Sequence, residues 1–276
     1  MTTPLQLAAN GFEFSGFSVG PPDGRTVLLL HGFPQTSRSW RDVADRLAAA
    51  GLRAVAIDQR GYSPGARPSE VTAYALPSLI ADVCAVVDAL GGPVDLVGHD
   101  WGAVVGWQVA ARHPDRVRTW TAISTPNQLA LNEVLAVDDE QRQRFGYILA
   151  FREPGRAEAA LLADDARRLR ELYGGAVPAD RVEADIAVLT QPGALTAALN
   201  WYRAMSPHDA DGLGLVTVPT TYIWGTDDVA FGRRAAEESG RFVDADYTFV
   251  PLDGVSHWIP DQAPDAVADE ILARVI

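Results

Sequence analysis

The chain has 276 residues and a formal net charge of −13, from 36 acidic residues and 23 basic residues that are all arginine. Hydrophobic residues make up 47% of the sequence and charged residues 21%, which is the composition of a globular protein with a large core and not of a disordered chain. The negative charge without a basic stripe argues against nucleic-acid and anionic-membrane partners, and the absence of lysine excludes Schiff-base chemistry.

Three features of the sequence concern the compartment. No apolar run is long enough to span a bilayer, and residues 1–16 lack the basic and apolar segments of a signal peptide. The single cysteine, Cys84, cannot form an internal disulfide and suits a reducing environment. We therefore expect a cytoplasmic protein, and the arginine-rich composition suggests a bacterium with a GC-rich genome. No residue pattern predicts a metal site or a cofactor.

Strands and helices alternate over residues 1–124. Apolar runs bounded by turn residues predict strands, and apolar residues at helical spacing predict helices. The strands are expected at 12–19, 26–30, 53–57, 94–97 and 117–123, and the helices between 39 and 51, at 79–90 and at 101–112. Because these strands are continuous apolar runs separated by helices, we predict a mostly parallel α/β sheet with helices on both faces.

The pattern changes near Thr125. Up to Met205 the sequence predicts only helical segments, separated by proline and glycine pairs. Strands then return at 220–224 and 247–252, with helices at 233–240 and from 261. The sequence therefore predicts an α/β core of residues 1–124 and 206–276, into which residues 125–205 insert a helical cap.

The strand at 94–97 runs into Gly98-His99-Asp100-Trp101-Gly102, and a helix follows at once. This is the context of a nucleophile elbow, with Asp100 in the position that serine holds in many hydrolases. The glycines let strand and helix approach closely, and the helix N-terminus favours the ionised carboxylate. The sequence therefore predicts Asp100 as the nucleophile.

A carboxylate nucleophile restricts the substrate. Attack of Asp100 on a saturated carbon gives an ester, which water can hydrolyse at the carbonyl carbon of the aspartate. Attack on an ester substrate would give an anhydride, which is a poor route. The reacting bond is therefore expected at a saturated carbon, in an epoxide or an alkyl halide.

The partners of the nucleophile follow two later strands, at the strand ends where open α/β sheets place their sites. His257 follows the strand at 247–252 and is predicted as the general base that activates water. Asp228 follows the strand at 220–224 and is predicted to orient His257, with Asp227 as the alternative.

The oxyanion hole needs two backbone N–H groups. We assign one to Trp101, after the nucleophile, and the other to Phe33 in the His31-Gly32-Phe33-Pro34 loop. The residues expected to line the substrate pocket are His31, Pro34, Trp101 and Trp258.

Seven motifs in chain order carry a resemblance that covers nearly the whole chain. They read HGFPQTSRSW, DQRGYSPG, GHDWGA, FGYILAFREPG, NWYRAM, WGTDD and GVSHWIP. The chain resembles the epoxide hydrolases of the α/β-hydrolase superfamily. In that family two cap tyrosines donate hydrogen bonds to the epoxide oxygen, and the resemblance implies Tyr147 and Tyr202 for this role. A phenol can protonate the alkoxide that forms on ring opening.

Other activities remain open at this stage. Haloalkane dehalogenases share the aspartate followed by tryptophan, but they often carry asparagine where this chain has Phe33. Fluoroacetate dehalogenases carry arginine after the nucleophile, where this chain has Trp101. A binding protein on a hydrolase scaffold is a third alternative, which predicts a damaged site. The expected partners are a small hydrophobic epoxide and water, and a homodimer is possible.

Overall fold

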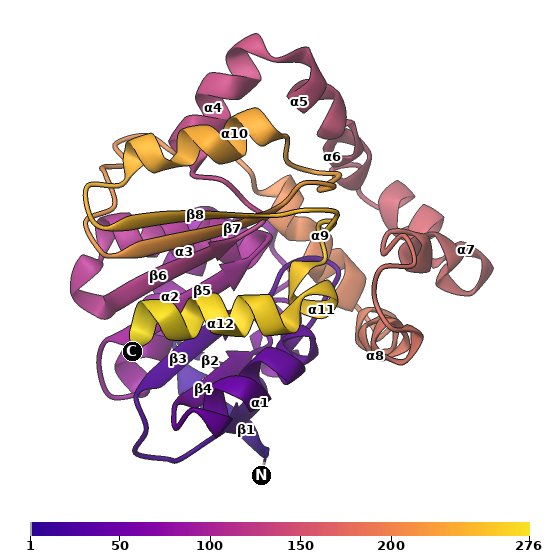
Figure 1. Cartoon of the computed structure of the whole chain (residues 1–276). Coiled ribbons are helices and arrows are strands. Elements are labelled where there is room, and N and C mark those ends of the chain that lie inside the picture. The colour runs from indigo at the N-terminus through magenta and orange to yellow at the C-terminus, as the bar shows by residue number, and fades with distance from the viewer. Residues whose placement is uncertain (1) are drawn as a thin grey trace.

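The alternating strands and helices assemble into one eight-stranded sheet with helices on both faces (Figure 1). The computed structural model describes residues 2–276. The strands are β1 Thr3–Ala9, β2 Phe12–Val19, β3 Thr26–Leu30, β4 Arg53–Ile57, β5 Val94–His99, β6 Val117–Ile123, β7 Thr220–Gly225 and β8 Tyr247–Leu252.

The α-helices are α1 Arg41–Ala49, α2 Leu76–Ala89, α3 Trp101–Arg112, α4 Gln128–Val137, α5 Asp139–Arg144, α6 Gly146–Phe151, α7 Arg156–Glu171, α8 Ala179–Leu189, α9 Ala194–Arg203, α10 Arg233–Glu238, α11 Ile259–Gln262 and α12 Pro264–Val275. Short 3₁₀ helices add η1 Ser37–Trp40, η2 Pro64–Ala66, η3 Val71–Tyr74, η4 Pro114–Arg116 and η5 Ser239–Phe242. None of the helices in residues 2–276 combines the length and the apolar character that crossing a membrane requires.

The strand order is β1-β2-β4-β3-β5-β6-β7-β8, with β1 and β2 antiparallel to their neighbours and the remaining pairs parallel. Side chains of β3 alternate between two cores. Val27 and Leu29 pack with α1 and α12 on one face, while Leu28 and Leu30 pack with α2 and α3 on the other. Burial on both faces explains the continuous apolar runs, and the predicted fold class is confirmed.

The structure adds to the predicted elements and shifts some of their ends. No strand was predicted at β1, which pairs with β2 through a two-residue turn at Asn10 and Gly11, both at positive φ. The first helix lies within the predicted range and begins at Arg41, after η1. The last helix begins at Pro264, since proline favours the first helical position, and the short α11 stands before it.

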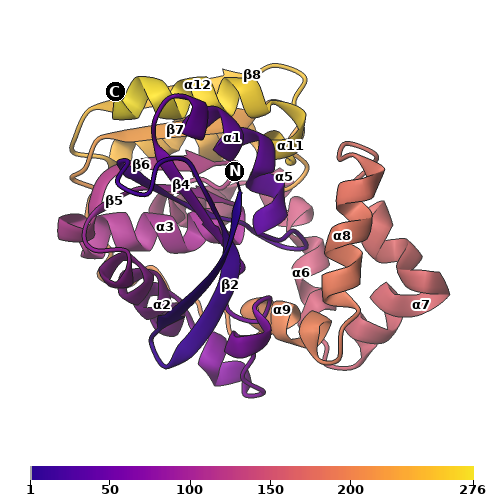
Figure 2. The ribbon, with the colours of Figure 1, turned by 90° about the horizontal axis from the view of Figure 1, so that it is seen from below.

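Residues 125–205 form helices α4–α9 and contain no strand within this described segment, as the sequence predicts. α4 packs against α10 and η5 of the sheet region, whereas α6–α9 stand to one side of the sheet (Figure 2). α8 and α9 return to contact η1 and η3. These helices therefore face the end of the sheet where β3, β5, β7 and β8 terminate.

Candidate active site

Asp100 occupies the tip of a sharp turn between β5 and α3. Its backbone has φ 51° and ψ −119°, a strained combination for a residue other than glycine. A Cβ atom at Gly98 would lie 2.4 Å from the Gly102 carbonyl oxygen, and one at Gly102 would lie 2.2 Å from the Leu30 carbonyl oxygen. Both positions of the predicted elbow therefore require glycine for close packing, not for turn conformation.

The two carboxylate oxygens of Asp100 have different surroundings. Oδ1 accepts a hydrogen bond of 2.7 Å from the Phe33 N–H, and the Trp101 N–H also donates to the carboxylate. Oδ2 lies 3.6 Å from Nε2 of His257. A Cβ atom at Gly32 would lie 2.1 Å from Oδ1, so only glycine leaves room for the held oxygen. The Phe33 N–H thus holds Oδ1, and Oδ2 is the oxygen that faces His257.

His257 lies between Asp100 and Asp228. Its Nδ1 donates to Asp228, with N–O distances of 3.1 and 3.2 Å. Oδ1 of Asp228 also accepts the backbone N–H groups of Ala230 and Phe231, at 2.7 and 3.0 Å. Asp228 is 2% exposed, whereas Asp227 is on the surface. The structure therefore brings Asp228, not the alternative Asp227, to the histidine.

The protonation of His257 depends on the neighbouring carboxylates of Asp100 and Asp228. Burial disfavours the imidazolium of His257, but the nearby carboxylates of Asp228 and Asp100 outweigh it and raise its pKa to about 10. Burial likewise disfavours an ionised Asp100, yet the hydrogen bond and charge of His257 lower its pKa below the usual value. At neutral pH the site therefore contains an imidazolium between two carboxylates.

Two other histidines lie near the site, and the structure corrects one prediction. His31 is fully buried, its Nε2 accepting the Gln59 N–H at 3.1 Å and its Nδ1 donating to the Gly32 carbonyl at 2.9 Å. It therefore supports the loop of Phe33 and does not line the pocket as predicted. His99 donates through Nε2 to the His257 carbonyl at 2.8 Å, and burial lowers its pKa to about 4, so it is neutral.

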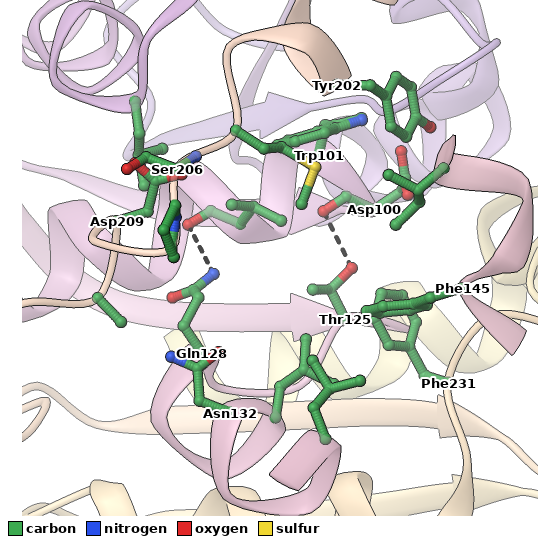
Figure 3. Close-up of a pocket in the computed structure, with 18 of the residues that line it drawn as sticks. Asp100, Trp101, Thr125, Gln128, Asn132, Phe145, Tyr202, Ser206, Asp209 and Phe231 are labelled. Atoms are coloured by element: carbon green, nitrogen blue, oxygen red, sulfur yellow. Dashed lines mark hydrogen bonds between the residues drawn. The ribbon is translucent and has the colours of Figure 1, made fainter. Parts of the chain in front are cut away.

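Tyr147 of α6 and Tyr202 of α9 face Asp100 from the helical segment. Their ring centroids are 6.2 Å apart, and the Tyr202 ring meets those of Trp101 and Phe33 edge-on, at 5.1 and 5.5 Å. Figure 3 shows the Tyr202 hydroxyl on the carboxylate side of Asp100. Desolvation and the charge of Asp100 raise the pKa of both phenols, so each remains a proton donor at neutral pH.

Asp100 and the two tyrosines line two cavities, of about 190 and 250 Å³. The first runs beside α3 and α4 and includes the predicted pocket residue Trp101 (Figure 3). The second includes His257 and the predicted Pro34 and Trp258. A molecule that reacts at Asp100 can therefore extend to either side of the tyrosine pair.

A buried polar network, which the sequence analysis did not predict, joins the helical segment to the oxyanion loop. Asp185 of α8 accepts the N–H and the hydroxyl of Thr36, at 3.1 and 2.7 Å, and the hydroxyl of Tyr173, at 3.0 Å. The Tyr173 ring stacks on Trp258 at 4.9 Å. Burial raises the pKa of Asp185 to about 7. No sequence signal marks this contact, because its members are far apart in the chain.

Thr125 is a second residue that the sequence analysis did not assign. Its hydroxyl donates to the Asp100 backbone carbonyl at 3.0 Å, a bond drawn in Figure 3. The bond ties the strained turn to the end of β6. Thr125 follows the last residue of the first predicted core segment. Its contact with the elbow arises from the fold, because the two are 25 residues apart in the sequence.

Comparisons with known proteins identify the family and the fold. Residues 25–264 match the sequence model of the alpha/beta hydrolase fold family. Epoxide hydrolase A of Mycobacterium tuberculosis is 33% identical, over 98% of this chain and 96% of its own length. AB hydrolase superfamily protein YfhM of Bacillus subtilis is also 33% identical, over 95% and 94%. The crystal structure of epoxide hydrolase A from Mycobacterium thermoresistibile superposes with a TM-score of 0.88 at 28% identity, covering 100% of this chain and 98% of that one.

Proposed function

The chain belongs to the alpha/beta hydrolase fold family, among its epoxide hydrolases, and we propose that it forms a vicinal diol through a covalent ester on Asp100. The observation that carries this mechanism is the asymmetry of the carboxylate. Oδ1 is held by the Phe33 N–H at 2.7 Å, and Oδ2 lies 3.6 Å from His257. Oδ1 therefore lies where backbone N–H groups can stabilise negative charge, and Oδ2 is the oxygen that attacks the substrate.

In the first step, Oδ2 attacks an epoxide carbon and the ring C–O bond breaks. The ring oxygen takes a proton from Tyr147 or Tyr202. It thereby becomes the hydroxyl group of a hydroxyalkyl ester. General acids in this position typically contribute about 10²- to 10⁴-fold in rate. Loss of the carboxylate charge removes one of the two groups that keep His257 protonated. His257 then releases a proton, and the tyrosinate left by ring opening takes one up and returns to the phenol, so no net proton is gained or lost.

In the second step, neutral His257 takes a proton from water, and the hydroxide oxygen attacks the carboxyl carbon of the ester. Negative charge collects on Oδ1, where the N–H groups of Phe33 and Trp101 stabilise it. Collapse breaks the bond between this carbon and Oδ2, the departing alkoxide takes the proton of the new carboxyl hydroxyl group, and the diol leaves with Oδ2. Asp228 keeps Nδ1–H directed away from the water and stabilises the imidazolium that re-forms.

An alkyl halide is the second candidate, because the same carboxylate could displace a halide. The tyrosine pair favours the epoxide, since a leaving halide needs no proton whereas an alkoxide does. Phe33 also offers no side-chain donor to a halide. The complete set of nucleophile, base, acid and oxyanion donors argues against a protein that only binds ligands.

Intact-mass spectrometry of the His257→Gln variant tests the covalent route. Incubation with a styrene-type epoxide is expected to add the mass of the substrate, because only the second step needs the base. Asp100→Ala is the matched control and must remain unmodified. An unmodified His257→Gln protein, with a substrate that the wild type consumes, would contradict the ester. Wild-type turnover of a bromoalkane without any epoxide would favour the dehalogenase instead.

The remaining predictions from the sequence belong to this proposal. Residues 125–205 would act as the cap that brings Tyr147 and Tyr202 over the nucleophile, with α4 fixed to the sheet region. The cytoplasmic location and the homodimer also stay predictions.

A further inference from the structure

The loop after β7 supplies the hydrogen bonds that hold the Asp228 carboxylate. Residues 228–232, here called the acid loop, lie between β7 and α10. Oδ1 of Asp228 accepts the N–H groups of Ala230 and Phe231 at 2.7 and 3.0 Å, and the carboxylate also accepts Nδ1–H of His257. The position of the carboxylate therefore depends on where the acid loop holds these two N–H groups.

Gln141 of α5 bonds to the acid loop with both ends of its amide. Its Nε2 donates to the Ala230 carbonyl at 2.8 Å, and its Oε1 accepts the Gly232 N–H at 2.9 Å. The two bonds fix the orientation of the amide, because a carbonyl accepts only from the NH₂ group and an N–H donates only to Oε1. The side chain of Gln141 is 2% exposed, so its loss would leave the buried Ala230 carbonyl without a partner.

Two further contacts come from the same end of α5. Nη1 of Arg144 donates to the Asp228 carbonyl at 2.6 Å. The ring of Phe145, the next residue, meets the Phe231 ring edge-on at 5.6 Å, and Figure 3 shows both rings beside Asp100. α5 therefore contacts the acid loop at its first residue, in its middle and at its last residue.

The sheet region contributes less to the acid loop than α5 does. Its one side-chain bond to the loop backbone, among the described residues, runs from Nε1 of Trp224 to the Phe231 carbonyl at 3.0 Å. Gln141 and Arg144 provide the other three bonds that the backbone receives from outside the loop. The backbone around the acid of the site is thus held mainly by the helical segment, from residues up to 89 positions away in the sequence.

We infer that Gln141 and Arg144 are positioning residues for Asp228, and that they act on ester hydrolysis and not on ester formation. Their bonds hold the acid loop so that its N–H groups stay directed at the Asp228 carboxylate. The carboxylate then keeps Nδ1–H of His257 in place, which leaves Nε2 to take the proton from water. The inference rests on the proposed function, since ester hydrolysis is the step in which His257 acts as the base.

Single-turnover rapid quench of Gln141→Leu, with an epoxide that the wild type consumes, separates the two steps. Ester hydrolysis is expected to slow about 10- to 100-fold, because a displaced Asp228 no longer orients the base. Ester formation should change less than about threefold, since it does not use the base. The variant should therefore accumulate protein carrying the mass of the substrate. Arg144→Met should show the same selectivity to a smaller degree, because it loses one bond to the loop and its other partner is the exposed Glu140.

Gln143→Leu is the matched control, because it removes the same amide from an exposed position of the same helix. It should keep both rates. Proton NMR of Nδ1–H of His257 reports on Asp228 without substrate, since a proton in a charge-assisted hydrogen bond resonates far downfield. This resonance should move upfield in Gln141→Leu and stay unchanged in Gln143→Leu.

Equal slowing of both steps in Gln141→Leu would show a structural role only and would overturn the inference. Ester hydrolysis at the wild-type rate, an unchanged Nδ1–H resonance, or the same selective slowing in Gln143→Leu would also overturn it. Arg144→Met decides by the same criteria if Gln141→Leu does not fold. A wild type that forms no ester would refute the proposed function and the step selectivity with it, whereas the resonance would still show whether α5 positions Asp228.

Discussion

Alkylation of Asp100 should change His257 from an acid into a base, and Asp100→Asn imitates that change without substrate. Oδ2 lies 3.6 Å from Nε2, and a unit charge at this separation is worth about 4–5 kcal/mol at an effective dielectric constant of 20. Removal of the charge corresponds to about three pKa units. The pKa of His257 is about 10 with both carboxylates present, so the variant should bring it to about 7.

The geometry of the variant supports the comparison. The amide oxygen should remain at the Oδ1 position, where it accepts the N–H group of Phe33. The NH₂ group then faces Nε2 and can donate to the neutral imidazole, which lowers the pKa further. A histidine near pKa 7 is suited to take a proton from water at neutral pH.

NMR titration of the labelled imidazole measures this shift directly. The wild-type resonance should stay that of an imidazolium above pH 9, well past the ordinary pKa of about 6.5, and the Asp100→Asn resonance should titrate near neutrality. Asp227→Asn is the matched control, because its exposed carboxylate is screened by solvent and its loss should shift the titration little. Mass spectrometry must confirm that the amide has not hydrolysed. The same His257 pKa in wild type and Asp100→Asn would refute the proposed coupling.

Three further outcomes test the site and its support. Tyr147→Phe and Tyr202→Phe should each slow ester formation but leave it measurable by rapid quench. The double variant should lose turnover, because no phenol then protonates the alkoxide. Near-normal turnover in the double variant would show that the tyrosines are not the proton donors. Gly32→Ala should lower kcat by about 100-fold or more in steady-state assays with little change in Tm, because its Cβ would lie 2.1 Å from the held oxygen of the nucleophile. Arg60→Met leaves the buried Asp82 carboxylate without its two 2.6 Å bonds from the guanidinium, so urea unfolding should show a loss of about 3–5 kcal/mol, and a loss below 1 kcal/mol would show that water reaches the carboxylate.

Much of the core could be predicted because its signals are local. Continuous apolar runs marked the six strands β3–β8, and glycine at 98 and 102 marked the elbow, where the structure leaves no room for a Cβ. β1 was missed although Asn10-Gly11 is a strong signal for a two-residue hairpin turn. Its outward residues are exposed, so the strand lacks the apolar run that identified the others.

Contacts between the helical segment and the sheet could not be predicted in the same way. The bond from Asp185 to Thr36 joins residues 149 positions apart, and although Thr36 lies in the HGFPQTSRSW motif, no pattern in the sequence links it to Asp185. His31 was predicted as a pocket residue because its motif contains oxyanion donors, but bonds to Gln59 and Gly32 hold its buried ring, which lines neither cavity at Asp100. Such features follow from packing and not from spacing.

The most direct test of the covalent mechanism follows oxygen through a single turnover. With enzyme in excess in ¹⁸O-labelled water, Oδ2 of Asp100 should leave with the diol and a water oxygen should replace it. The diol is therefore expected to be unlabelled, and the peptide containing Asp100 to gain the label. A labelled diol from the first turnover, with no label in the peptide, would mean that water attacks the epoxide directly and would contradict the ester on Asp100.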